Sequence, residues 1–207
     1  MKIINVNDYT SLAEVRQLVK RPHLDEVQVS EQSRERTKQV FGKALTPQES
    51  VAVILDEIRT TGDAGLLKYI EKLDGYALTS DQLFVSEVEF AQAETMVAPE
   101  FLTALKIAIA NIRAFHARQM ENSWFMPECD GIILGQKVTP LERVGIYVPG
   151  GNAPLVSSVL MSAIPAQVAG VEEIIMATPL RQGCIDPHLL VAAKLCGVTK
   201  VLKAGGA

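Results

Sequence analysis

The chain has 207 residues, of which 48% are hydrophobic and 21% are charged, and its net charge at pH 7 is −4. This composition is typical of a globular protein with a sizeable core, and the even spread of charge argues against nucleic acid or an anionic membrane as a partner. The opening stretch MKIINVNDYTSL has no apolar run long enough for a signal peptide or a membrane span. Because three cysteines without C-x-x-C spacing favour a reducing compartment, we expect a cytoplasmic protein.

The first part of the sequence predicts helices. Apolar residues recur at helical spacing over residues 12–19, and the polar segment from Pro22 to Ser33 is expected to be irregular. At TPQE, Thr46 can cap a helix, Pro47 suits its first position and Glu49 can complete a capping box. Helix starts are therefore predicted near residues 12 and 47.

Glycines and turn residues divide the segment that follows. Gly62 can end the helix that begins at TPQE, and Asp63 can cap the next helix, which reaches the Asp74-Gly75 turn. The stretch QLFVS, residues 82–86, is rich in residues that favour β structure. It predicts a short strand within the helical region.

Two further helices are predicted before the sequence changes character. Ser86 and Glu89 repeat the capping-box pattern for a helix that runs to about Val97. Pro99 begins a longer helix that is expected to end near Met120. Its apolar stripe consists of Leu102, Leu105, Ile109, Ile112 and His116. A histidine in such a stripe is expected to be packed or hydrogen-bonded rather than to act as a base.

A domain boundary is expected near residue 125, where the turn-rich stretch ENSWFMPECDG precedes an extended segment from Ile132 to Thr139. Beyond it, short apolar strands alternate with helices at residues 144–148, 155–169, 173–177, 187–195 and 200–202. The strands lack strict alternation, which is typical of a parallel sheet covered on both faces. The sequence predicts an α/β protein, with a helical region and a short strand over 1–125 and a parallel βαβαβ domain over 126–207.

The stretch Tyr147-Val148-Pro149-Gly150-Gly151 lies where the first of these parallel strands ends and a helix begins. Ligands of open parallel sheets bind beyond the carboxyl ends of the strands, so this turn is a candidate nucleotide site, although a G-x-G-x-x-G pattern is absent. Tyr147 offers a flat face and a hydroxyl, Pro149 fixes one dihedral angle, and the two glycines allow close backbone approach. The alternative is that the glycines serve only the geometry of a tight turn.

The stretch VGIYVPGGNAPLVSSVLMSAIPAQVAGVEEIIMATP, followed by AAKLCGV and AGGA, closely resembles histidinol dehydrogenase. The resemblance extends more loosely through the helical half, including Trp124 and FHARQ. It implies an aldehyde-dehydrogenase-like fold, in which residues 126–207 form an incomplete Rossmann-like domain that binds NAD without the usual glycine fingerprint. It also implies a zinc-dependent, NAD-linked oxidation of L-histidinol to L-histidine by an interlocked homodimer. It also implies that Tyr147 and Pro149 bind NAD, and the turn geometry adds Gly150 and Gly151 to this set.

The resemblance further implies that the catalytic and zinc-binding residues lie beyond this chain, so none of either kind is predicted within it. The chain is then expected to be the N-terminal portion of the enzyme, inactive alone, with cofactor binding as its contribution. Two alternatives remain open. One is a related zinc and NAD dehydrogenase of another small polar alcohol, and the other is a non-enzymatic interaction module that ends at Ala207.

Several reactive side chains are interpreted as structural. Cys184 and His188 lack a second pair of ligands to complete a zinc site, and Asp186 is expected to cap a helix that begins at Pro187. Cys196, in the apolar run LVAAKLCGV, is expected to be a small buried residue.

Charged residues near the predicted strands are also given structural roles. Glu142 and Arg143 are expected to form a surface pair, because they precede a strand rather than follow one. The adjacent Glu172 and Glu173 are expected to be solvated.

Overall fold

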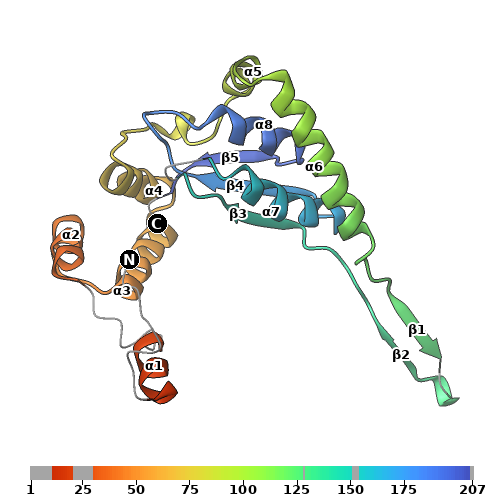
Figure 1. The fold of residues 1–207 in the computed structure, drawn as a ribbon. Helices are drawn as coiled ribbons and strands as arrows, with labels where there is room; N and C mark the ends of the chain where they lie inside the picture. Colours follow the sequence, from red (N-terminus) through yellow and green to blue (C-terminus); the bar gives the residue numbers. More distant parts are fainter. Residues whose placement is uncertain (1–10, 21–29, 128, 151–153, 206–207) are drawn as a thin grey trace. The chain divides into compact units, whose positions relative to one another are not determined.

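A computed structural model describes residues 11–20, 30–127, 129–150 and 154–205. The chain divides into two compact units, Met1–Ser50 and Val51–Ala207 (Figure 1). The described residues of the first unit form α1 (Leu12–Val19), α2 (Glu31–Phe41) and the first turn of a third helix. The predicted helix over 12–19 is confirmed. The irregular segment predicted to reach Ser33 is wrong at its end, where α2 has already begun, and residues 21–29 lie outside the described part.

Helix α3 (Pro47–Thr61) begins at the predicted capping box. The amide of Thr46 donates to Glu49 Oε2 at 2.8 Å, and the amide of Glu49 donates to Thr46 Oγ1 at 3.3 Å. The next helix, α4 (Asp63–Tyr69), continues into a π-helical turn (Ile70–Asp74). Gly62 rather than Asp63 is its N-cap, because the chain turns there at φ 61°, a conformation that glycine adopts without strain.

The segment before α5 contains a short 3₁₀ turn (Ser80–Gln82), followed by residues that pair with the sheet. The predicted strand at QLFVS is only an isolated antiparallel bridge, between Phe84 and Leu202. Two hydrogen bonds flank this bridge, from Val85 N to Val201 O at 2.9 Å and from Lys203 N to Leu83 O at 2.8 Å.

Helices α5 (Glu87–Met96) and α6 (Pro99–Ala117) follow as predicted, although α6 ends before Met120. The capping box of α5 is formed by Ser86 and Glu89. In the described part of the chain no single helix is long and apolar enough to cross a membrane. The pair α5 and α6 passes that test only together, and it is bent by 109° at the break between its members.

A two-stranded antiparallel hairpin follows α6. Strand β1 (Trp124–Pro127) pairs with β2 (Ile133–Gln136), and every residue of both strands is exposed. The predicted extended segment 132–139 contains β2, whereas β1 was not predicted because ENSWFMPECDG was interpreted as a turn-rich boundary.

The predicted βαβαβ succession is confirmed. Strands β3 (Arg143–Tyr147), β4 (Glu173–Thr178) and β5 (Lys200–Lys203) form a parallel sheet in the order β3-β4-β5. Helix α7 (Val156–Val168) connects β3 to β4, and α8 (Pro187–Leu195) connects β4 to β5. The register places Ile146 beside Met176 and Met176 beside Val201.

One face of this sheet forms the main core. Ile174, Met176 and Val201 are buried together with the apolar faces of α7 and α8. Intervening residues on the strands are more exposed, and a Cβ at Gly145 would have no atom within 4 Å. The expectation of strands covered on both faces is therefore wrong for the described residues, because both connecting helices contribute to a core on one side.

Helices from the first half of the sequence form part of the same core. Helix α5 packs on α8 and α6 packs on α7, as Figure 1 shows, so Ala93, Val97 and Leu105 are buried in one cluster with the sheet residues. The division between 1–125 and 126–207 stays a prediction, since both of these regions contribute to the compact unit Val51–Ala207.

The exposure of the hairpin leads to a prediction for the fluorescence of Trp124, the single tryptophan of the chain. Because Trp124 is 53% exposed, the emission of residues 1–207 is expected to lie close to that of free tryptophan in water and to be quenched readily by iodide. N-acetyltryptophanamide serves as the reference for full exposure. Blue-shifted emission with slow quenching would show that the hairpin is covered in solution.

The Lys203–Glu89 ion pair predicts a pH-dependent contribution to stability. Lys203 is only 8% exposed, and its Nζ lies 2.8 Å from Glu89 Oε1. Burial raises the pKa of Glu89, but hydrogen bonds from Lys203 and Ser86 outweigh it and hold the pKa below 4.5. The pair therefore stabilises the fold above pH 4.5, and its contribution is lost as the pH falls through the lower folded-state pKa.

Lys203→Met is expected to lower the free energy of unfolding at pH 7 by about 1–2 kcal/mol, between the values typical of exposed and buried pairs. The difference from wild type should shrink below pH 4.5, as measured by urea unfolding across pH. Lys200→Met is the matched control, because the Lys200–Glu173 pair is more exposed and should contribute less. Equal losses in the two variants would contradict this account.

Candidate functional site

The carboxyl ends of the three parallel strands meet at Pro179. The amide of Val148 extends the pairing of β3 by donating to Ala177 O at 2.9 Å, so the chain enters the predicted turn alongside the end of β4. Gly150 on one side and Gly205 on the other both approach Pro179. This is the edge at which open parallel sheets bind ligands.

The absence of side chains at Gly150 and Gly205 allows this close packing. A Cβ on Gly150 would lie 2.6 Å from Pro179 Cγ, and a Cβ on Gly205 would lie 2.2 Å from Pro179 Cβ. Both separations are far below van der Waals contact, so any side chain would push the strand ends apart. For Gly150 this supports the purely geometric alternative, while Gly151 lies outside the described residues.

Tyr147 lies at the end of β3 with its side chain on the open side of this junction. The residue is 53% exposed, and its hydroxyl donates to the carbonyl oxygen of Gly205 at 3.2 Å. The hydroxyl is thus held by the main chain beyond β5, which leaves the ring as an accessible apolar face. Pro149 is half-buried beside it.

Asp74 reaches the same junction from the π-helical turn. Its Oδ2 accepts a hydrogen bond from the amide of Gly205 at 3.1 Å. Both polar main-chain groups of Gly205 therefore have side-chain partners, Asp74 for the amide and Tyr147 for the carbonyl.

Sequence reasoning missed three residues of this junction: Asp74, Pro179 and Gly205. Asp74 was interpreted only as part of a helix-ending turn. A signal was nevertheless available, because Pro179 and Gly205 lie two and three residues beyond the predicted strands 173–177 and 200–202, at the edge where Tyr147 was already placed.

The described residues of the junction enclose one small cavity. This cavity of about 20 Å³ is lined by Gly150, Pro154, Pro179, Arg181, Asp186 and Leu189. This is room for about one water molecule.

Other polar candidates have structural partners. Asp186 caps α8 as predicted, since its Oδ1 accepts from the amide of His188 at 2.9 Å and also lies 2.9 Å from His188 Nδ1. The Nδ1 atom of His116 is hydrogen-bonded to Gln119 Oε1 at 2.6 Å, as the packed or bonded interpretation expected. Cys196 is buried, and burial raises the pKa of its thiol to about 11.

The described residues contain no group of three or more His, Cys, Asp or Glu side chains placed to hold a metal ion. The side chains present in this part of the chain therefore do not fit a zinc site, and Cys184 and His188 are not joined by further ligands.

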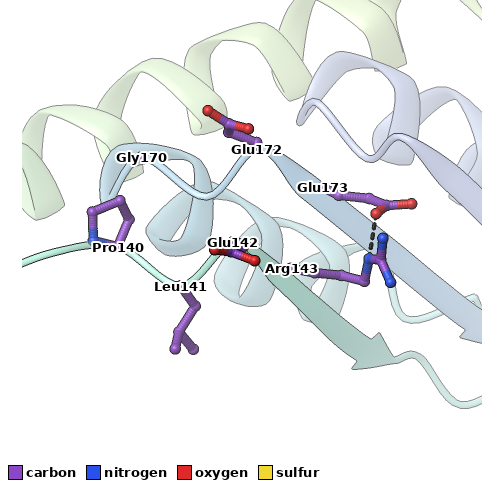
Figure 2. Close-up of a pocket in the computed structure, with 7 residues that line it drawn as sticks. All are labelled: Pro140, Leu141, Glu142, Arg143, Gly170, Glu172 and Glu173. Atoms are coloured by element: carbon purple, nitrogen blue, oxygen red, sulfur yellow. Dashed lines mark hydrogen bonds and ion pairs between the residues drawn. The ribbon is translucent and has the colours of Figure 1, made fainter.

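An open hollow of about 880 Å³ lies at the amino ends of β3 and β4 (Figure 2). Glu173 projects toward Arg143 across the two strands, and its Oε1 also accepts from Lys200 at 3.0 Å. These hydrogen bonds, from Lys200 first and then Arg143, hold the pKa of Glu173 below its usual value. The prediction that Arg143 pairs with Glu142 is wrong, because the parallel register places Arg143 beside Glu173. The prediction that Glu173 is only solvated is wrong for the same reason. Surface ion pairs thus lie beside the hollow, which is at the opposite end of the strands from Tyr147.

The parallel β3-β4-β5 sheet, with its connecting helices and a junction at the strand carboxyl ends, defines an α/β protein of the Rossmann-like class. The sequence model for histidinol dehydrogenase matches residues 36–207. The chain therefore belongs to the histidinol dehydrogenase family.

Curated relatives and a solved structure agree with this membership. Histidinol dehydrogenase of Symbiobacterium thermophilum is 50% identical over 161 residues, which cover 77% of this chain and 37% of that protein. The enzyme of Syntrophotalea carbinolica is 49% identical over 160 residues, with the same coverage of both chains. The crystal structure of histidinol dehydrogenase from Elizabethkingia anophelis matches with a TM-score of 0.75 and 35% identity, over 94% of this chain and 41% of that chain. The chain thus spans about 37% of the length of these curated relatives.

The packing at Pro179 predicts that Gly205→Ala destabilises the chain by about 1–3 kcal/mol, because the added Cβ must displace the end of β4 or β5. Gly145→Ala is the matched control on the same sheet, and it should change stability by less than about 0.5 kcal/mol. Urea unfolding followed by circular dichroism measures both. A Gly205→Ala protein as stable as the control would mean that the strand ends are not tightly packed.

Proposed function

We propose that this chain is the N-terminal portion of a histidinol dehydrogenase and supplies part of its NAD-binding surface. The whole enzyme would oxidise L-histidinol to L-histidine in a zinc-dependent, NAD-linked reaction. The observation that carries the proposal is the family match over 36–207. The exposed ring of Tyr147 at the strand carboxyl ends agrees with it, since this is where sheets of this class bind nucleotides.

The residues at the junction fit a dinucleotide bound on an open surface. Tyr147 would contact NAD through its ring, Pro149 would form an adjoining apolar wall, and Gly150 with Gly151 would keep the turn free of side chains. NAD, when bound, accepts hydride from the alcohol. The role of this chain's residues is to bind the dinucleotide and to fix its orientation.

Helix α7 follows the turn, and its N-cap Leu155 provides no side-chain hydrogen bond to the first amides. Such a helix start favours a negatively charged group nearby, which agrees with a pyrophosphate. The described residues do not fit zinc, so the metal ligands and the acid-base residues are assigned to the part of the enzyme that this chain does not span. We further propose that the whole enzyme is a cytoplasmic homodimer without nucleic-acid or membrane partners.

The test is an assay of the protein encoded by the complete reading frame that contains these 207 residues. With NAD and zinc, two NADH per L-histidinol are expected, with activity lost on chelation. Residues 1–207 alone are expected to give no turnover, because they lack the catalytic residues.

Other amino alcohols serve as competing substrates in the same assay. Turnover of one of them, but not of L-histidinol, would replace the substrate and keep the dehydrogenase class. No reduction of NAD with any alcohol would favour an interaction module instead.

A further inference from the structure

We propose that Asp74 is a positioning residue for the dinucleotide, and that it acts by holding Gly205 and, through Gly205, Tyr147. The inference rests on the proposed function, because Tyr147 matters for a cofactor only if NAD binds beside it. Asp74 is linked to Tyr147 by the two hydrogen bonds made at Gly205. Its effect is transmitted through one residue of main chain.

The contacts form a short series. Asp74 Oδ2 accepts from the amide of Gly205 at 3.1 Å, and the carbonyl of Gly205 accepts from the Tyr147 hydroxyl at 3.2 Å. Asp74 precedes Tyr147 by more than seventy residues, so only the tertiary fold brings these groups together. Because Asp74 holds the amide of Gly205, it also fixes the position of the Gly205 carbonyl oxygen, which accepts the hydrogen bond from the Tyr147 hydroxyl.

The end of a helix does not favour an aspartate at this position. Asp74 is the last residue of the π-helical turn, and a negative charge is unfavourable at the C-terminal end of a helix. The helix end itself is completed by Gly75, whose φ is 79° and whose amide bonds to the carbonyls of Ile70 and Glu71. The distant amide of Gly205 therefore provides a reason for the carboxylate that the helix does not.

The element that presents Asp74 is anchored in the fold. Tyr69, the last residue of α4, and Ile70, the first residue of the π-helical turn, are 3% and 2% exposed. A carboxylate on a packed element holds its partner more precisely than one on a loose segment. Asp74 can therefore hold the chain beyond β5 in a fixed position.

Strand β5 is held independently of Asp74. Lys203 N donates to Leu83 O, Lys203 Nζ pairs with Glu89, and Val85 N donates to Val201 O. Loss of the Asp74 carboxylate should therefore leave the sheet intact and free only the segment after Lys203. That segment carries the acceptor for Tyr147, so cofactor binding should change more than folding.

The experiment uses the protein from the complete reading frame and the variants Asp74→Ala, Asp74→Asn and Asp56→Ala. Asp56 is the matched control, an exposed aspartate on α3. Asp74→Ala is expected to raise the Kd and the KM for NAD about tenfold, the effect of one charge-assisted hydrogen bond. The kcat at saturating NAD and the KM for L-histidinol should stay within about twofold.

Asp74→Asn keeps an oxygen acceptor, so it should restore most of the affinity and raise the Kd for NAD no more than about threefold. Asp56→Ala should leave all constants unchanged. Thermal unfolding of each variant accompanies the kinetics, since a purely structural role would lower Tm and the amount of active enzyme without raising the KM for NAD.

Tyr147→Phe completes the test, because it removes the hydroxyl and keeps the ring. If Asp74 acts through Gly205, the double variant Asp74→Ala/Tyr147→Phe should bind NAD only about as weakly as the worse single variant. If the two single-variant increases in the Kd for NAD instead multiply in the double variant, Asp74 and Tyr147 do not act through the same residue, Gly205. An unchanged KM for NAD in Asp74→Ala would overturn the positioning role, while wild-type protein that does not bind NAD would refute the proposed function and this inference with it.

Discussion

The packing of Pro179 between Gly150 and Gly205 is the contact on which the candidate site depends. It brings the ends of all three parallel strands within van der Waals reach, and any side chain at either glycine would separate them. Because the strand ends are in contact, the Tyr147 hydroxyl can reach the carbonyl of Gly205. An exposed aromatic face is thereby held at the edge of the sheet where ligands bind.

The helical part of the unit is joined to this edge by polar contacts as well as by the core. Lys203, which is buried, forms an ion pair with the more exposed Glu89 between β5 and the start of α5, and Asp74 binds the amide of Gly205. The capping carboxylate of Glu89 thus has two functions, since it completes a helix start and neutralises a buried lysine. Helices that sequence alone places in a separate region therefore help to shape the carboxyl end of the sheet.

Local signals predicted much of the fold correctly. The capping boxes at Thr46 and Ser86, and the proline that begins α8 at Pro187, act through neighbouring residues and need no tertiary context. Local errors were the missed start of α2 and the missed strand β1, and two further errors concern partners that are distant in sequence. Arg143 pairs with Glu173 rather than with its neighbour Glu142, and QLFVS contributes a single bridge to Leu202, because register across strands decides both.

For this protein, the sequence by itself determined most of the helices, the βαβαβ order of the parallel sheet, the family, and the position of Tyr147 at the end of a strand. Those properties follow from periodicity, capping and motif, which are encoded within short segments. Only the tertiary structure decided that one face of the sheet carries the core and that Asp74, Pro179 and Gly205 meet. The physical reason is that hydrogen bonds and close packing depend on distances in space, and residues that are far apart in the chain acquire those distances only when the strands pair.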